Sequence, residues 1–212
     1  MPDMIGAGLS YIVETVFQEG LSTALRRVMH ARARVAKEIF LDELRRGAKA
    51  IEDVGDVDEA AAMVFRFARA GQEGTARSNL RIMAQVLVGT LQQRPIYADE
   101  FLRWADVIAN LRREEIILAT TFHRHWKIEQ TKTEDSNKAL WDAETATKAE
   151  LIGADRVFVD QAVYARNMTA LARTGLVRIF SQLSGIAFVP SDLMDDLVRL
   201  TRIEDALNEP RR

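Results

Sequence analysis

Apolar side chains recur every three to four residues along most of this chain, which is the spacing of amphipathic helices. Within the first fifty residues the repeat includes Leu9, Ile12, Val16, Leu25, Val28 and Val35. Gly20 interrupts the repeat, and a glycine inside a helix costs about 1 kcal/mol relative to alanine. Gly20 either kinks one long helix or separates two, and we favour two helices, over residues 4–19 and 21–49.

Capping signals and helix breakers place the next elements. Asp56 and Asp58 precede an apolar repeat, and carboxylates stabilise the N-terminal end of a helix, so a helix is expected over 58–70. Gly71 or Gly74 should end it. The pattern then predicts a helix from Thr75 to a break at Pro95, one from Tyr97 to Leu111, one from an Asn110 cap to Gln130, an exposed loop at 130–138 and a weaker helix at 139–152.

The periodicity changes near the C-terminus. A helix expected over 155–173 runs into Gly175, and glycine suits the left-handed turn that follows a helix. Two short strands come next, with a turn between Gln182 and Gly185, and Ser191 or Asp192 caps a last helix over 191–207.

The predicted fold class is mostly α: a helical bundle with a small C-terminal part that contains a β-hairpin at about 176–189. We divide the chain into helical regions at 1–94 and 95–212. With 212 residues, of which 48% are hydrophobic and 28% charged, the chain is ordinary for a globular protein with a real core.

The order of elements at this end resembles a known architecture. A helix that leads into Thr174-Gly-Leu-Val, a short hairpin, and then Pro190-Ser-Asp-Leu-Met-Asp-Asp-Leu are similar to the third helix, wing and following helix of winged-helix proteins. Such modules bind DNA, bind RNA or mediate protein contacts. If this one binds nucleic acid, the candidate contacts are Arg166, Asn167, Arg173 and Arg178.

Charge and apolar content argue against that use of the module. The helix at 155–173 has a net charge of only +1, and affinity for nucleic acid rises with each phosphate neutralised. Apolar residues occupy most of its circumference, so we expect the helix to be covered, in a structural or protein-contact role.

A second resemblance covers residues 80–125. Met83-Ala-Gln-Val-Leu-Val-Gly, the helix from Glu100 to Leu111 and Glu114-Glu-Ile-Ile-Leu-Ala are similar to the helical core of the abortive-infection alpha family of bacterial phage-defence proteins. This resemblance implies a bacterial or phage setting and a defence role, and it implies no catalytic residue.

Charge is distributed unevenly in the first sixty residues. Residues 21–51 hold eight Lys or Arg against three Asp or Glu, whereas residues 52–59 hold five acids and no base. Arg27 and Arg34 on the basic helix could track phosphates or an anionic membrane surface, or could be a solvated face. Our preferred interpretation is that the apolar positions of residues 9–35 let an N-terminal arm pair with another copy.

No motif for chemistry stands out. The chain lacks cysteine, so thiolate ligands and cysteine nucleophiles are absent. His123 and His125 are two apart on a helix and point about 200° apart, so they cannot chelate one ion, and the usable pair is His125 with Glu129. We predict no catalytic residue, no metal and no cofactor.

We therefore expect a non-enzymatic protein that acts through protein contacts, with a protein partner or another copy of itself. The alternative is a nucleic-acid-binding regulator that uses the winged-helix-like module and the basic helix 21–49. No apolar run approaches the roughly 20 residues that span a bilayer, and no signal peptide is evident, so the expected location is the cytoplasm.

Overall fold

The computed structural model describes residues 23–46, 57–93, 98–182, 185–203 and 207. These residues form eight helices and one two-stranded antiparallel sheet, which confirms the mostly helical fold with a C-terminal hairpin. The predicted helix at 4–19 lies outside the described residues, as do Leu9, Ile12, Val16, Asp56 and Pro95. Within the described part, no helix is long and apolar enough to cross a bilayer.

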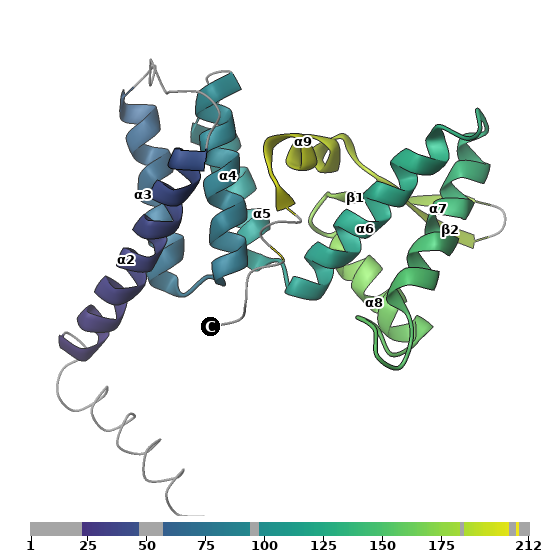
Figure 1. Cartoon of the computed structure of the whole chain (residues 1–212), viewed down its shortest axis with the longest axis horizontal. Coiled ribbons are helices and arrows are strands. Elements are labelled where there is room, and N and C mark those ends of the chain that lie inside the picture. Colours follow the sequence, from purple (N-terminus) through teal and green to yellow (C-terminus); the bar gives the residue numbers. More distant parts are fainter. Residues whose placement is uncertain (1–22, 47–56, 94–97, 183–184, 204–206, 208–212) are drawn as a thin grey trace, which may run out of the picture.

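Four helices pack together at one end of the molecule (Figure 1): α2 (Thr23–Arg46), α3 (Val57–Glu73), α4 (Arg77–Gln93) and α5 (Ala98–Asn110). The helix α4 is the centre of this group, because α2, α3 and α5 all contact it. Nine consecutive residues of α4, from Leu80 to Val88, are buried. A surface helix buries only one stripe, so α4 is a fully covered core helix.

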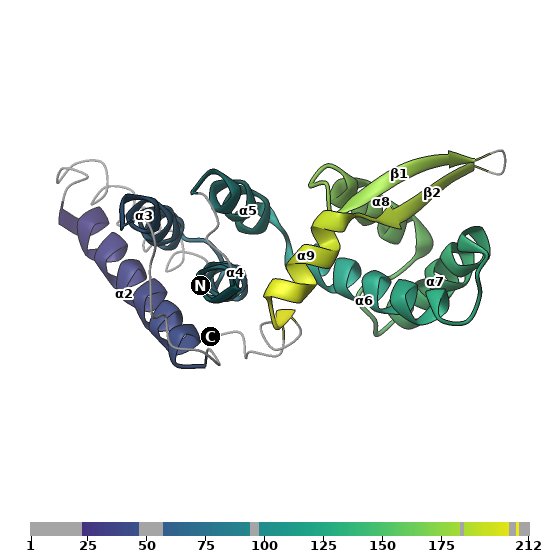
Figure 2. The same ribbon diagram turned by 90° about the horizontal axis from the view of Figure 1, so that it is seen from above.

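The second group of elements follows in chain order: α6 (Arg113–Gln130), α7 (Ser136–Leu151), α8 (Gln161–Ala172), β1 (Val177–Gln182), β2 (Gly185–Pro190) and α9 (Asp192–Leu200). The helix α6 contacts α7, α8, α9 and the hairpin. The helix α9 also contacts α4, and Figure 2 shows it between the two groups. The α9 helix therefore joins the two halves of the molecule.

Two local predictions at the hairpin are confirmed. Gly175 has a positive φ of 79°, which an L side chain rarely adopts, so glycine allows the turn from α8 into β1. Ser191 is the N-cap of α9, and its Oγ accepts from the Met194 N–H at 3.3 Å. The same hydroxyl donates to the Gly175 carbonyl at 2.6 Å. The start of α9 is thereby fixed to the turn before β1.

The prediction that Asn110 caps the next helix is wrong. The N-cap of α6 is Arg112, whose N–H donates to the Glu115 carboxylate at 2.8 Å. The Asn110 amide instead donates to the Asp106 carbonyl at 2.8 Å, one turn back in α5. The reach of Glu115 back to the cap satisfies the helix end without a polar side chain at position 110.

Three predicted boundaries also shift because of contacts that a periodicity does not reveal. The helix α7 begins at Ser136, inside the predicted loop, because Asp135 caps it and accepts from Asn137 N at 2.9 Å. The predicted helix at 155–173 begins only at Gln161. The helix α9 ends at Leu200, where the chain becomes extended at Thr201, and Ile203 and Leu207 of the predicted range are helical again after this break.

The shortened α8 is not covered all round, contrary to the prediction. Val157, Phe158 and Val159 precede the helix, and within it only Tyr164, Met168 and Leu171 are buried hydrophobics. Ala162, Ala165 and Thr169 on the opposite side are exposed. Some of the apolar residues that led us to predict a helix covered on all sides therefore lie in the turn before α8.

Candidate functional site

The hairpin carries exposed apolar side chains on neighbouring positions. Ile179 and Phe180 in β1 are each 55% exposed, and Ile186 in β2 is 68% exposed. We call Ile179 and Ile186, which share one face of the sheet, the hairpin surface. Its exposure is unusual for residues that normally contribute to the interior, so it is a candidate contact site.

Strand register explains why the hairpin surface is exposed. Val177 pairs with Pro190 at the base of the hairpin, and both are buried. Farther along the same face, Ile179 stands diagonally across from Ile186, whose direct partner is Ser181. Since successive residues of a strand alternate between faces, Phe180 lies on the other face. One apolar face thus begins in the core and continues outward into solvent.

The hairpin also offers unpaired backbone and almost no charge. Within the described residues its sheet contains only β1 and β2, so each strand has one outer edge without a strand partner. Arg178 is the only charged residue from position 177 to 190. An apolar, nearly neutral two-stranded element with open edges can accept another strand or pack face to face with an apolar surface.

The four nucleic-acid candidates near the hairpin are not equally available. Arg166 and Arg178 are exposed. Arg173 lies 3.5 Å from the buried carboxylate of Glu115, and the Asn167 amide donates to the Val163 carbonyl at 2.8 Å. An amide bonded within its own helix is a poor base-reading group, so three exposed arginines are left on this surface, of which Arg173 is paired with Glu115.

The remaining nucleic-acid candidates, Arg27 and Arg34, are exposed on α2. The helices α2 and α8 lie at opposite ends of the molecule in both views (Figures 1 and 2). The six predicted contacts therefore do not form one surface.

The described candidates for self-association also differ from one another. Leu25 and Val28 are 40% and 46% exposed near the start of α2. Val35, two turns farther on, is half-buried and packs against the core. Only the first two are available to another molecule.

The histidines of α6 tie that helix to its neighbours. The Nε2 atom of His123 lies 2.7 Å from Oδ1 of Asp195 in α9, and Lys127 approaches the same oxygen at 2.8 Å. Burial alone would raise the pKa of Asp195, but the hydrogen bonds from Lys127 and His123 hold it below its ordinary value. The Asp195 carboxylate thus holds α9 to α6 through its contacts with His123 and Lys127.

His125 forms an equivalent link to α7. Its Nε2 atom lies 2.8 Å from Glu150, which also pairs with Arg124 at 2.6 Å. Burial alone would raise the pKa of Glu150. The contacts with His125 and Arg124 outweigh burial, so the pKa of Glu150 lies below its ordinary value. Glu129, the residue one turn from His125 that could have shared a metal with it, pairs with Lys132 at 2.7 Å. The described residues contain no group of three potential metal ligands.

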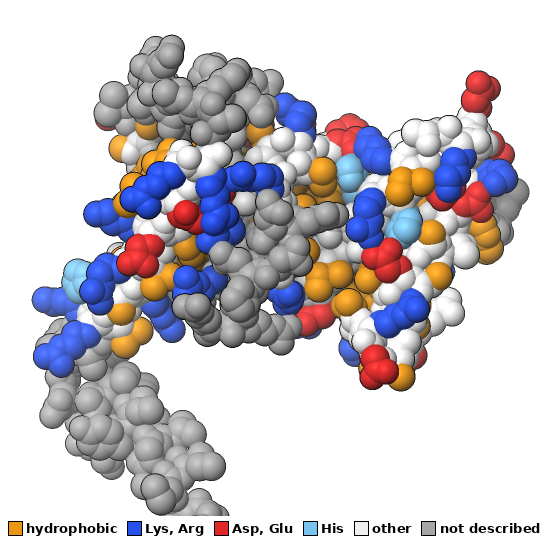
Figure 3. All heavy atoms as spheres, viewed as in Figure 1, with side chains coloured by type: hydrophobic (Ala, Val, Ile, Leu, Met, Phe, Trp, Pro, Cys, Tyr) orange, Lys and Arg blue, Asp and Glu red, His pale blue; other side chains and the backbone are white. Residues whose placement is uncertain are grey.

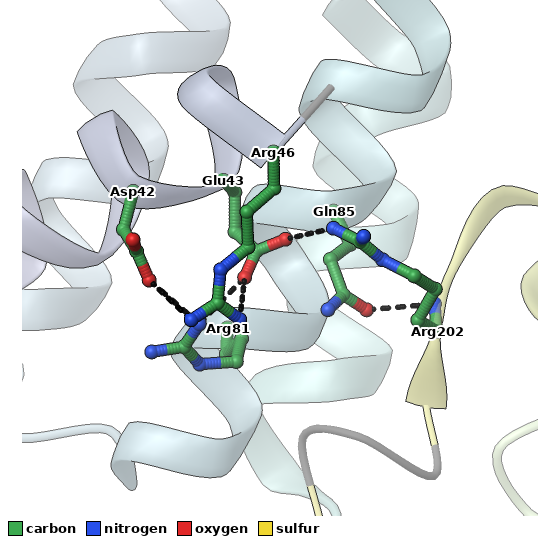
Figure 4. Close-up of polar contacts among 6 residues, drawn as sticks. All are labelled: Asp42, Glu43, Arg46, Arg81, Gln85 and Arg202. Carbon is green, nitrogen blue, oxygen red and sulfur yellow. Dashed lines mark hydrogen bonds and ion pairs between the residues drawn. The ribbon is translucent and has the colours of Figure 1, made fainter. Parts of the chain in front are cut away.

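A buried charge cluster, which the sequence did not reveal, joins α2, α4 and the segment after α9 (Figure 4). Glu43 is 1% exposed, and its carboxylate lies 2.6 Å from Arg81, 3.0 Å from Arg202 and 3.6 Å from Arg46. Gln85 accepts from the Arg202 N–H at 2.9 Å. The sequence signal was the presence of Arg81 and Gln85 one turn apart in the apolar middle of α4.

A groove of about 530 Å³ lies beside this cluster, between α6 and the segment that follows α9. Its basic lining residues are His123, Arg124, Lys127 and Arg202. Each of them is already within ion-pair distance of Asp195, Glu150 or Glu43. The groove therefore presents paired charges, which hold the helices together, in place of free cations for a ligand.

Comparisons of the chain with family models, with curated proteins and with solved structures find no match. The likenesses to winged-helix proteins and to the abortive-infection alpha family accordingly stay predictions.

Proposed function

We propose that this is a non-enzymatic protein that acts through protein contacts, and that the hairpin surface binds a second copy of the chain. The observation that carries this proposal is the exposure of Ile179 and Ile186 on one face of a two-stranded sheet whose outer edges are unpaired within the described residues.

Charge favours a second copy as the occupant. A strongly charged contact surface calls for a partner of opposite sign, because like charges placed against each other cost several kcal/mol. The hairpin has one charged residue, Arg178, so two copies of it can approach with little repulsion. In a twofold arrangement the same patch contributes from both molecules, which suits an apolar surface that complements itself.

The state of the histidines and carboxylates supports a non-enzymatic role. His123 and His125 each bond a carboxylate on a neighbouring helix, at 2.7 and 2.8 Å. These contacts give both histidines a structural role in holding α6 to α9 and α7. The likeness of residues 80–125 to the abortive-infection alpha family adds phage defence as the proposed biological setting.

Sedimentation velocity of the full chain across a range of concentrations tests the proposal. The wild type is expected to shift from monomer to dimer as concentration rises. Ile179→Lys and Ile186→Lys each place two equal charges in the contact, so each should weaken dimerisation at least tenfold. Val159→Lys is the matched control, because Val159 is 65% exposed but precedes α8 and lies outside the hairpin.

A double variant separates the hairpin from the apolar start of α2. Leu25→Ser/Val28→Ser removes the two exposed self-association candidates of α2, and it should leave the dimer intact. A monomer at all concentrations, or a dimer that survives both hairpin variants, contradicts the proposal. Circular dichroism of each variant verifies that the helical fold is retained.

A further inference from the structure

The outer side of α2 carries a row of basic side chains. Arg26, Arg27, His30, Arg34, Lys37 and Arg45 are all exposed. At about 100° per residue, these positions fall within an arc of about 100° on the helix. Figure 3 shows Lys and Arg side chains gathered over α2. We call these six residues the α2 row.

The α2 row lies opposite the side of the helix that packs. Ala36, Ile39 and Glu43 are buried and mark the face directed at α3 and α4. The basic side chains therefore point away from the bundle. Leu41 is the one exposed apolar residue in the same arc, between Lys37 and Arg45.

The charges of the α2 row have no ion-pair partner among the residues that the structure describes. From Thr23 to Lys37 the helix has five Lys or Arg and no acid. None of the row's arginines, nor Lys37, forms an ion pair with another described residue, in contrast to Arg46, which pairs with Asp42 at 3.1 Å. A row of exposed cations without ion-pair partners among the described residues produces a local positive potential despite the net charge of −2 for the whole chain.

We propose that the α2 row binds the phosphate backbone of a nucleic-acid duplex. From Arg26 to Arg45 the row extends about 28 Å along a straight helix, at about 1.5 Å per residue. A duplex presents about one negative charge per 1.7 Å of its axis with both strands counted, so a duplex segment of this length carries more phosphates than the row has cations. The contact reads no bases, since arginine and lysine bind phosphates without sequence information.

Two other anionic partners fit the α2 row less well. Single strands are bound by basic grooves with aromatic side chains on which bases stack, and the row has no aromatic residue. Insertion into an anionic membrane requires apolar side chains on the face that meets the lipid, and the row offers Leu41 alone. A rigid duplex needs neither feature. The inference is independent of the hairpin surface, which lies on other elements.

Salt dependence of duplex binding by the full chain tests this assignment. A fluorescent duplex of about 24 base pairs, as DNA and as RNA, is titrated with protein between about 50 and 200 mM salt. Each phosphate neutralised contributes about −0.9 to the slope of log K against log salt, so five cations give a slope of up to about −4.5. That slope corresponds to a loss of affinity of up to about 500-fold over this range.

The variant Arg27→Gln/Arg34→Gln/Arg45→Gln should make the slope shallower by about 2.7, because it removes three phosphate contacts. The matched control, Arg103→Gln/Arg166→Gln/Arg178→Gln, changes net charge equally at exposed arginines of α5, α8 and β1. It should leave the slope unchanged. If the triple variant of α2 does not fold, single variants at Arg27 and Arg34 should each reduce the slope by about 0.9.

Three results overturn the assignment. The first is the absence of duplex binding at about 50 mM salt. The second is that the control variant loses duplex binding while the α2 variant keeps it, which would assign binding to the winged-helix-like end. The third is binding to vesicles that contain phosphatidylserine with no binding to either duplex. The hairpin variants Ile179→Lys and Ile186→Lys should bind duplex with the wild-type slope. Absence of duplex binding and absence of the proposed dimer are therefore separate results.

Discussion

Replacement of Arg81 by methionine should destabilise the protein strongly, because it leaves Glu43 as a buried charge. Arg81 is 5% exposed and Glu43 is 1% exposed, and their side chains meet at 2.6 Å. Methionine retains much of the apolar stem of arginine while it removes the positive charge. The experiment therefore changes the electrostatic contact more than the packing.

The size of the effect follows from the charges. Two unit charges about 4 Å apart attract by about 4 kcal/mol at an effective dielectric constant of 20. Removal of one partner from a buried pair costs about 3–5 kcal/mol, which agrees with that value. Arg202 and Arg46 offset little of this loss, because their side chains are 50% and 47% exposed and interact with Glu43 partly through solvent.

The double variant Glu43→Leu/Arg81→Met removes both buried charges. Its free energy of unfolding should lie within about 1 kcal/mol of the wild type, since apolar replacements of a buried pair are often neutral or stabilising. Urea unfolding of the wild type, both single variants and the double variant completes the cycle. If Arg81→Met costs less than about 1 kcal/mol, or the two single losses add, the buried pair is not the interaction described here.

Two further predictions concern helix packing and pH. Gly71→Ala should lower the free energy of unfolding, measured in urea, by about 1–3 kcal/mol, because a Cβ at Gly71 would lie 2.5 Å from the Ala36 Cβ. The control is Gly153→Ala, which should be nearly neutral because its Cβ would meet the flexible Arg156 side chain at 3.2 Å. In the folded protein the pKa values of Asp195 and Glu150 lie below their ordinary values of 3.8 and 4.5. The stability that these two carboxylates contribute is therefore complete above the ordinary pKa values and is lost as the pH falls through the lower folded-state pKa values. Asp195→Asn/Glu150→Gln should therefore be less stable at about pH 6 and lose less stability between about pH 6 and pH 3, and an unchanged dependence on pH would refute this.

Most of the fold could be predicted because its signals are local. The apolar repeat, the Gly175 turn and the Ser191 cap each depend on residues close in the chain. Gly175 adopts the expected positive φ, and Ser191 caps α9 as predicted. The hairpin at 177–190 appears where the helical repeat stops.

The side-chain links between helices could not be predicted, because their partners are far apart in the chain. His123 meets Asp195 across 72 positions, and Arg202 meets Glu43 across 159. A helical periodicity shows which face is buried but not which helix covers it. The same limit explains why Glu150, the carboxylate that His125 contacts, was not predicted.

The candidate surfaces were located in part. The sequence indicated the basic helix, and Arg27 and Arg34 belong to the exposed α2 row. It did not indicate that α2 and the winged-helix-like end are at opposite ends of the molecule (Figure 1). The hairpin surface was not predicted as a contact site, because a run such as Ile179-Phe180 is equally expected in a buried strand.

Sedimentation velocity of wild type and Ile186→Lys, at matched concentrations, tests the central claim most directly. The hairpin account predicts a concentration-dependent dimer for the wild type and a dimer at least tenfold weaker for the variant, with Val159→Lys like the wild type. A wild-type chain that stays monomeric, or a variant that dimerises as strongly as the wild type, would contradict the assignment of the hairpin surface.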